Sequence, residues 1–277
     1  MEKIRRSILY VPGSNLRALQ KARQLSCDVV ALDLEDSVAP EAKPTARQAV
    51  CGALRDFGAR EVVVRINPLS TPWGADDLAA VTRARPDGIV LPKVDDASQL
   101  ASIGGDIPLW VMIETPRAVL NLAAIAAGGA AVLMLGSNDL LSAMGARAMP
   151  DRRNLWGAMT EIVIAARAHG LEAIDGTFNA IDDGAGLAAE CAQGRAFGFD
   201  GKTLIHPSQI ETANRAFSPD ENELADARRI VAAFKRPENH DKGAIALDGR
   251  MVERLHAKGA ARLIARAETI AARRPSC

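Results

Sequence analysis

The sequence contains few aromatic residues, cysteines and histidines, and it has no net charge. Of its 277 residues, 4% are aromatic, four are cysteine and four are histidine, and 34 basic side chains balance 34 acidic ones. Cys27, Cys51, Cys191 and Cys277 lie far apart with no Cys-x-x-Cys pair, so neither a disulfide framework nor a zinc ribbon is predicted. The balanced charge argues against a protein that binds nucleic acid or acidic membranes non-specifically.

Long apolar runs are also missing. The nearest candidate, 122–136, is rich in Ala and Gly and shorter than the roughly 20 apolar residues of a membrane span. Near the start, the run Ile8–Val11 stops at Pro12-Gly13, which is too early for a signal peptide. There is no Walker A motif, nucleophile elbow or HExxH motif. We therefore expect a soluble, cytoplasmic protein.

One pattern recurs through most of the chain: a short apolar, β-branched run and then an Ala-rich amphipathic stretch. Continuous apolarity is typical of parallel strands that are buried on both faces. The predicted strands are Ser7–Val11, Val29–Leu32, Val62–Ile66, Gly88–Leu91, Leu109–Ile113, Ala131–Leu135, Glu172–Ile174 and Lys202–Ile205. Eight strands alternating with helices over about 210 residues predict a (β/α)8 TIM barrel. A doubly wound open sheet is the alternative.

The pattern changes after Pro207. A helix is predicted at Ser218–Phe234, with Ser218 as its cap and Pro219 in its first turn, and a last helix from about Val252 to Arg273. We therefore expect a barrel domain at 1–215 and a helical extension at 216–277 that closes over the barrel mouth or packs on a neighbouring subunit.

Two acidic residues follow neighbouring strands of the predicted barrel. Glu114 comes directly after the fifth strand, and Asp139 comes shortly after the sixth. Adjacent strands lie about 4.8 Å apart, so both carboxylates could bind one hard cation. Oxygen ligands, with water and substrate completing the shell, are typical of Mg²⁺. The alternative is that each carboxylate caps the helix that follows it.

Arg65 ends an apolar run, Val62–Val64, that is predicted to be buried. A buried arginine needs a carboxylate partner. One interpretation is a structural salt bridge to Asp33, Glu35 or Asp36. The other is that the guanidinium group of Arg65 donates hydrogen bonds to a substrate and orients its carboxylate or carbonyl oxygen.

Other ionisable residues at strand ends have weaker signals. The crowded carboxylates of segment 33–36 call for cations, which Lys43 and Arg47 on the next helix could supply. Lys93 is either a Schiff-base lysine or, as we favour, a cation in the same network. His206 is either a base or a hydrogen-bonded structural residue.

These residues belong to motifs that extend over nearly the whole chain. The motifs are Arg6-Ser7-x-Leu9-x-Val11-Pro12-Gly13, Asp33-Leu34-Glu35-Asp36, Val64-Arg65-Ile66-Asn67, Leu91-Pro92-Lys93, Glu114-Thr115-Pro116, Gly136-x-x-Asp139-Leu140, Gly198-Phe199-Asp200-Gly201-Lys202, Ile205-His206-Pro207-Ser208-Gln209-Ile210 and Gly249-Arg250-Met251-Val252. In this order they resemble the citrate lyase β-subunit-like (CitE-like) family of the HpcH/HpaI aldolase superfamily.

The resemblance implies a TIM barrel that assembles as trimers or hexamers and uses Mg²⁺ to cleave a C–C bond in a 3-hydroxyacyl thioester. By matched position, Glu114 and Asp139 are the expected metal ligands, and Arg65 and Glu114 the expected contacts to the keto-acid part. Asp33 and Gly136, at the second and sixth strand ends, are also expected to bind substrate.

The tail carries a further expected site residue. Family members usually have Asp in the tail motif Gly-x-Met-Val/Ile-Asp, where it reaches a neighbouring subunit's site as an acid/base, and Glu253 stands at that position here. The Gly/Met-Pro pair that often follows is replaced by Arg254-Leu255. We expect Glu253 to keep the carboxyl function.

The expected activity is therefore cleavage of citramalyl-CoA, malyl-CoA or citryl-CoA into acetyl-CoA and a 2-keto acid (pyruvate, glyoxylate or oxaloacetate). One alternative is an HpcH-type aldolase that acts on free 4-hydroxy-2-keto acids and yields pyruvate. Another is a non-catalytic barrel that serves as a subunit, which the intact set of Arg65, Glu114 and Asp139 disfavours.

Overall fold

The computed structural model describes residues 3–273, so Cys277 lies outside the described residues. The chain forms two compact units: Arg5–Phe217, and a second unit made of the segment before Arg5 and the segment from Ser218 onward. The three cysteines of the described part are free thiols, as predicted. Within residues 3–273, no helix has the length and apolar character that a membrane span requires.

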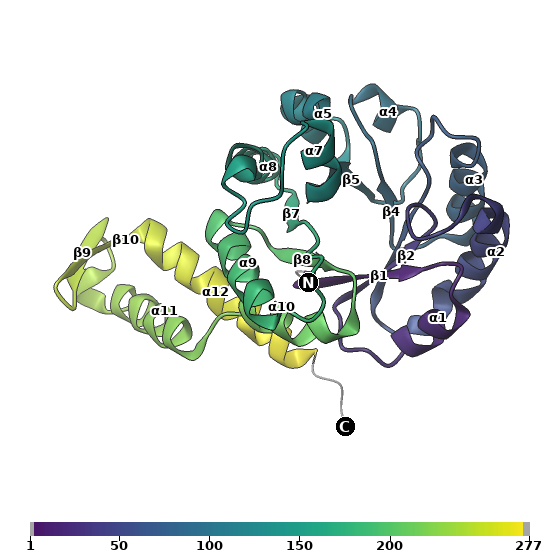
Figure 1. Ribbon diagram of the computed structural model, residues 1–277. Coiled ribbons are helices and arrows are strands. Elements are labelled where there is room, and N and C mark those ends of the chain that lie inside the picture. The colour runs from purple at the N-terminus through teal and green to yellow at the C-terminus, as the bar shows by residue number, and fades with distance from the viewer. Residues whose placement is uncertain (1–2, 274–277) are drawn as a thin grey trace. The chain divides into compact units, whose positions relative to one another are not determined.

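The first unit is a closed barrel of eight parallel strands in sequential order, with β1 paired to β8, which confirms the predicted fold (Figure 1). The strands are β1 (Ser7–Pro12), β2 (Val29–Asp33), β3 (Glu61–Arg65), β4 (Gly88–Leu91), β5 (Leu109–Ile113), β6 (Ala130–Leu135), β7 (Glu172–Asp175) and β8 (Gly201–Leu204). The closure excludes the open doubly wound sheet. The continuous apolar runs located the strands correctly because these strands are buried on both faces.

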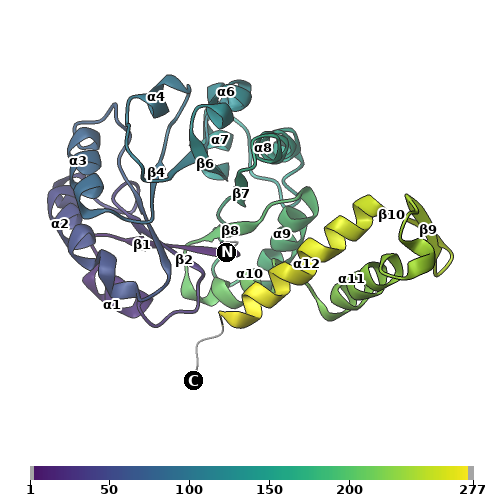
Figure 2. The same ribbon diagram turned by 180° about the vertical axis from the view of Figure 1, so that it is seen from behind.

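Helices surround the strands (Figures 1 and 2). They are α1 (Leu16–Ala22), α2 (Lys43–Ala53), α3 (Gly74–Ala84), α4 (Ser98–Ala101), α5 (Pro116–Leu120), α6 (Leu122–Ala127), α7 (Ser137–Ala143), α8 (Trp156–Ala168), α9 (Gly184–Phe197) and α10 (Ile210–Ala216). The short helices α7 and α10 were not predicted from the sequence. Helix α7 is important for the site, because it begins immediately after β6 and carries Asp139 in its first turn.

Two apolar layers form the core of the barrel. Alternate strand residues such as Ile8, Ala31 and Val63 form a cluster around Trp110 that fills the interior, and a larger cluster lies between strands and helices. At the amino ends of the strands, the Arg5 guanidinium lies 4.6 Å from the ring centre of Trp110 and pairs with Glu61 and Glu172. The interior is therefore packed at this end, which leaves the carboxyl ends for a site.

The second unit consists of two helices and a β-hairpin. Helices α11 (Glu221–Phe234) and α12 (Arg254–Ala272) pack along each other, and strands β9 (Ala244–Leu247) and β10 (Arg250–Glu253) pair antiparallel between them in the sequence. The predicted start of the first helix was wrong. Asp220, not Ser218, caps α11, because it forms a reciprocal capping box with Glu223.

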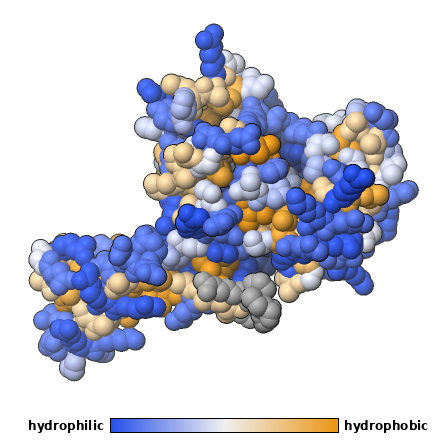
Figure 3. Space-filling view, turned by 60° about the horizontal axis from the view of Figure 1, so that its bottom comes forward, coloured by the Kyte–Doolittle hydropathy of each residue, from blue (hydrophilic) through white to orange (hydrophobic). Residues whose placement is uncertain are grey.

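Large apolar side chains also reach the surface, among them Leu16, Leu120, Met251 and Leu255. On the face shown in Figure 3, hydrophobic residues form separate patches among hydrophilic ones. Isolated exposed apolar side chains are ordinary on a folded protein.

Candidate active site

The alternation of side chains along the strands directs one set of polar residues into the top of the barrel. Asp33 lies two residues after the inward-facing Ala31, Arg65 two after Val63, and Glu114 two after Met112. Residues two apart on a strand share a face. A packed apolar interior therefore ends, at the carboxyl ends of the strands, in a layer of charged side chains.

A cavity of about 310 Å³ opens over this layer. Its charged wall includes Asp33, Asp36, Arg65 and Asp139, and apolar side chains such as Met112 also line it. Further lining residues are Tyr10, Pro12, Ser37, Leu135, Gly136, Ser137, Asn138, Thr177, Asn179, Thr203 and Ile205. This volume lies at the small end of the range of ligand sites, so it suits a compact acid better than a large molecule.

Arg65 forms a two-pronged ion pair with Asp33. Its Nε and Nη2 donate to the two carboxylate oxygens at 2.7 and 2.8 Å, while Nη1 contacts Glu35 at 3.0 Å and Asp36 at 3.3 Å. Burial alone would raise the pKa of Asp33, but the charge and hydrogen bonds of Arg65 outweigh it, and the pKa is lowered. The predicted salt bridge is therefore present, and Arg65 also lines the cavity.

Glu35 is a second carboxyl that contacts Arg65. Burial, opposed by Arg65 and supported by the neighbouring charges of Asp36 and Glu114, raises the pKa of Glu35 to about 8. At neutral pH this carboxyl is mostly protonated, whereas Asp33 is ionised. Arg65 therefore contacts one carboxyl whose pKa is lowered and one whose pKa is raised.

Glu114 and Asp139 share one cation, the ammonium group of Lys93. Lys93 Nζ hydrogen-bonds Asp139 and lies 3.6 Å from Glu114, whose Oε1 also accepts the backbone N–H of Lys93 at 2.7 Å. Burial raises the pKa of Glu114 despite the opposing effect of Lys93, and Asp139 raises it further. Neither carboxylate caps a helix, because Thr115 and Gly136 hold the N-cap positions of α5 and α7.

Gly136 makes room for the Glu114 carboxylate. A Cβ atom built at position 136 would lie 2.6 Å from Oε2 of Glu114, which is closer than real Cβ contacts. Gly136 also lines the cavity. The glycine thus permits the carboxylate to approach the cavity at this point.

The two carboxylates fit a hard divalent cation whose coordination shell is completed by other ligands. Two carboxylates from neighbouring elements already hold a positive charge between them, that of Lys93. Within residues 3–273, no group of three or more His, Cys, Asp or Glu side chains gathers closely enough to hold a metal ion. Water and substrate oxygens would supply the remaining positions, which is the habit of Mg²⁺.

The structure brings five of the six predicted site residues together at one end of the barrel: Asp33, Arg65, Glu114, Gly136 and Asp139. The sixth, Glu253, belongs to the second unit, where it is exposed and caps α12 through the backbone N–H of His256. Glu35 was predicted as a possible partner of Arg65, and Lys93 as either a Schiff-base lysine or a cation of the charged network.

Two predicted cation assignments were wrong. Lys43 donates to the carbonyls of Leu34 and Glu35 and to Asn67, and Arg47 pairs with Asp77. Neither neutralises the carboxylates of segment 33–36, because Arg65 occupies that position. His206 caps the turn that follows β8 through Nδ1, in agreement with its structural interpretation.

A second buried charge network lies outside the barrel lining. Asp175, the last residue of β7, follows the inward-facing Ile174 and turns away from the interior. It pairs instead with Lys202 at 3.0 Å and Arg152 at 2.7 Å, and Lys202 also contacts Glu190 at 2.6 Å. This network joins β7 and β8 to α9 and is structural.

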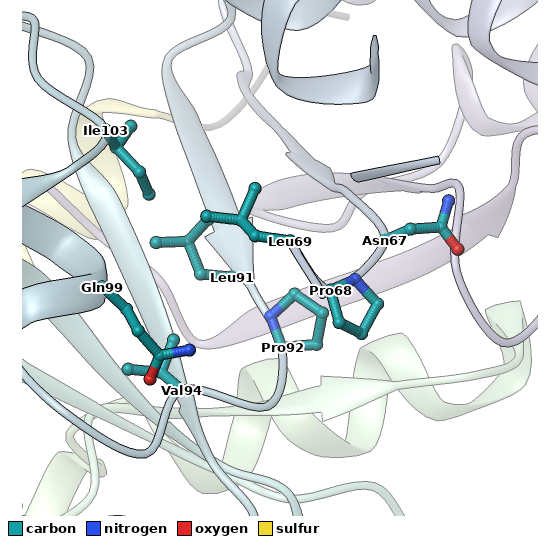
Figure 4. Close-up of a pocket in the computed structure, with 8 residues that line it drawn as sticks. All are labelled: Asn67, Pro68, Leu69, Leu91, Pro92, Val94, Gln99 and Ile103. Atoms are coloured by element: carbon teal, nitrogen blue, oxygen red, sulfur yellow. The ribbon is translucent and has the colours of Figure 1, made fainter. Parts of the chain in front are cut away.

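A small pocket of about 10 Å³ lies between the ends of β3 and β4 and the α4 region (Figure 4). Its apolar lining includes Leu69, Leu91 and Ile103. This volume has room for about one water molecule, so the pocket is too small for a ligand. It marks close packing around Pro92 and Val94, the neighbours of Lys93.

A closed parallel barrel with paired carboxylates at the ends of two neighbouring strands has the architecture of an aldolase or lyase. The HpcH/HpaI aldolase/citrate lyase family matches residues 6–207, and the chain belongs to this family. Membership confirms the resemblance stated above and the expected carbon–carbon lyase class of enzyme.

The chain is similar to several proteins over nearly its full length. The chain is 46% identical to the (3S)-malyl-CoA thioesterase of Cereibacter sphaeroides, over 98% of this chain and 97% of the relative. It is 34% identical to the citrate lyase subunit beta of Leuconostoc mesenteroides subsp. cremoris, over 91% and 90%. The crystal structure of CitE from Mycobacterium tuberculosis with magnesium, acetoacetate and coenzyme A is similar with a TM-score of 0.82 and 34% identity, over 95% of this chain and 97% of that one.

Proposed function

We propose that the protein cleaves the C–C bond of a 3-hydroxyacyl-CoA thioester of the malyl-CoA or citramalyl-CoA type, with Mg²⁺ bound by Glu114 and Asp139. The observation that carries this proposal is the carboxylate pair, which holds one positive charge at the edge of a cavity that also contains Arg65. The magnesium in the CitE structure and the malyl-CoA substrate of the 46% identical relative support it.

The residues divide the work of a retro-Claisen cleavage. Glu114 and Asp139 would hold the metal, which would supply Lewis-acid chemistry to oxygens of the substrate. Arg65 stabilises developing oxyanion charge. Its Nη1 is available for this because the contact to Asp36 is long, 3.3 Å, and the Asp36 side chain is 65% exposed, so a substrate oxygen can replace it. Asp33 holds the guanidinium in position, and the cavity floor beside Gly136 accepts the keto-acid part.

Cleavage takes a proton from the 3-hydroxyl and adds one to the thioester enolate that leaves, so a single acid/base group can accept the first proton and donate the second. We assign this role to Glu253 of a neighbouring subunit in a homotrimer or hexamer, by analogy with the tail acid of the family. Glu253 is exposed and fixed at the start of α12, so its carboxyl is presented to a partner rather than buried in its own unit.

Hydrolysis of the same thioester is the second candidate. It is favoured by the (3S)-malyl-CoA thioesterases, which are 46% identical over nearly the full length. The two reactions differ in the bond that breaks: cleavage of C–C yields acetyl-CoA and a 2-keto acid, and hydrolysis yields free CoA and the hydroxy acid.

The decisive experiment incubates the protein with malyl-CoA, citramalyl-CoA and citryl-CoA, each with Mg²⁺ and with excess EDTA. Acetyl-CoA, keto acid and free thiol are measured in parallel. Metal-dependent acetyl-CoA with an equal amount of keto acid supports the lyase, whereas free CoA without keto acid identifies the hydrolase. If neither product forms, a free 4-hydroxy-2-keto acid, with pyruvate as product, becomes the substrate to test.

A further inference from the structure

Lys93 has a strained backbone. Its φ angle is +53°, in the left-handed region, which is unfavourable for a residue with a side chain. The conformation directs two donors to the same place: the backbone N–H reaches Glu114, and the ammonium lies between Glu114 and Asp139. A strained residue that binds both proposed metal ligands suggests a function for the strain.

The surroundings hold the backbone of Lys93 and leave its side chain free. Leu91 and Val94 are each 3% exposed, and Pro92 and Val94 line the small closed pocket of Figure 4. The Lys93 side chain is 35% exposed. The ammonium can therefore move toward solvent by rotation of its side chain, without a change in the loop.

We propose that Lys93 is an internal counterion that competes with the metal for Glu114 and Asp139. Without metal, the ammonium neutralises the two carboxylates and keeps them together. When the metal binds, the ammonium gives up its position and remains nearby as a repelling charge. This inference rests on the proposed metal site and extends it to the affinity with which the metal is held.

Removal of the ammonium has two opposite consequences. The metal-free protein loses stability, because Glu114 and Asp139 then repel each other without a cation. The affinity for a divalent cation rises, because a nearby like charge is removed and no group has to be displaced from the two carboxylates. A lysine that merely orients the carboxylates would affect both quantities in the same direction, so that its loss lowers both.

The test measures Mn²⁺ binding by electron paramagnetic resonance and by calorimetry, in the absence of any thioester, for three variants. Lys93→Met removes the charge at similar length, and Lys93→Gly removes it while relieving the left-handed strain and keeping the backbone N–H to Glu114. Lys93→Arg keeps the charge. Thermal unfolding in EDTA and circular dichroism accompany each measurement.

We expect Lys93→Met and Lys93→Gly to bind Mn²⁺ at least about tenfold more tightly than the wild type, and Lys93→Arg within about threefold of it. In EDTA, Lys93→Met unfolds at a lower temperature, with Lys93→Gly less affected. Equal or weaker Mn²⁺ binding by folded Lys93→Met or Lys93→Gly overturns the inference. Absence of Mn²⁺ binding by every protein overturns it together with the metal site, whereas Mn²⁺ binding without thioester cleavage leaves it intact and removes only the proposed reaction.

Discussion

The carboxylate of Glu114 occupies space that a side chain at position 136 would need. A Cβ atom there would lie 2.6 Å from Oε2 of Glu114 and would also collide with the Glu114 Cβ. Because Glu114 is 1% exposed and its Oε1 accepts a hydrogen bond from the Lys93 backbone, it has little room to retreat. The small size of Gly136 is therefore a requirement of the site.

Gly136→Ala should remove divalent-cation binding and lower thioester cleavage at least about a hundredfold, because a misplaced ligand costs both affinity and orientation. Gly157→Ala in α8 is the matched control, since a Cβ there meets nothing within 4 Å. That variant should keep full activity and be slightly more stable, as expected for Ala in a helix. Mn²⁺ titration and initial rates on both variants provide the measurement. Normal metal binding by Gly136→Ala would show that Glu114 is not a ligand.

Asp139→Ala should abolish Mg²⁺ binding and thioester cleavage but leave the fold intact. The carboxylate is 39% exposed at the start of α7, so its removal leaves no cavity in the core. Circular dichroism, Mn²⁺ titration and the cleavage assay test this, with the exposed Asp182→Ala as the control. Full Mg²⁺-dependent activity in Asp139→Ala would contradict the assignment of Asp139 as a metal ligand.

Glu35→Gln should change how stability depends on pH. Burial raises the pKa of Glu35 to about 8 in the folded protein, above about 4.3 for an unfolded chain. The folded state therefore binds more protons between these values, and the free energy of unfolding of the wild type falls as pH rises through this window. The variant lacks this loss, so its stability relative to wild type should rise from about pH 5 to about pH 8 and then level off. Urea unfolding in EDTA from pH 5 to 9 measures the difference, and a constant difference would place the Glu35 pKa outside the window.

Lys202→Met should destabilise the barrel by up to about 3–5 kcal/mol, because the buried carboxylates then keep only Arg152 as their cation. Lys202 and Asp175 are both completely buried, and Lys202 also holds Glu190. The double variant Lys202→Met with Asp175→Asn should recover part of the loss, since one positive charge then balances one negative charge in the network. Urea unfolding of the single and double variants gives the coupling energy. Additive losses would mean that the pair contributes no specific interaction.

Glu253→Gln should lower kcat much more than it raises KM, because a proton donor acts in the transition state and not in substrate binding. Glu253→Asp, which restores the usual family residue, should retain substantial turnover. Helix content is compared in both, because Glu253 also caps α12. An unchanged kcat in Glu253→Gln would assign the proton transfer to another group.

The sequence was sufficient to locate most of the site because strand order and side-chain alternation are both encoded locally. Glu114 and Asp139 follow consecutive parallel strands, so their proximity follows from the barrel. Arg65 ends a buried run, so its need for a carboxylate follows from burial alone. The pairing of Arg65 with Asp33 required only that β2 and β3 be neighbours, and their register places these two residues side by side.

Other features depended on side-chain and backbone orientations that cannot be predicted from the sequence. Lys43 and Arg47 were predicted to neutralise the carboxylates of segment 33–36, but they bind other groups nearby. The groups that a helix side chain reaches depend on how the helix packs on the sheet. Lys93 was predicted as a cation of the charged network, but its position between Glu114 and Asp139 is reached with a positive φ angle that the sequence does not indicate. The β10 strand at Arg250–Glu253 was missed, because a short exposed hairpin lacks the apolar run that marked the barrel strands.

The pairing of β1 with β8 also has a consequence for synthesis on the ribosome. On the β8 side, Ser7 pairs with Lys202 and Leu9 pairs with Leu204, whereas on its other side β1 pairs with β2. The first strand therefore leaves the exit tunnel long before its second partner exists, and one edge of the growing sheet stays open until the last strand has been made. Contacts between distant parts of a chain slow folding and leave strand edges exposed in the meantime. A nascent chain of this protein should thus depend on chaperones until its eighth strand emerges.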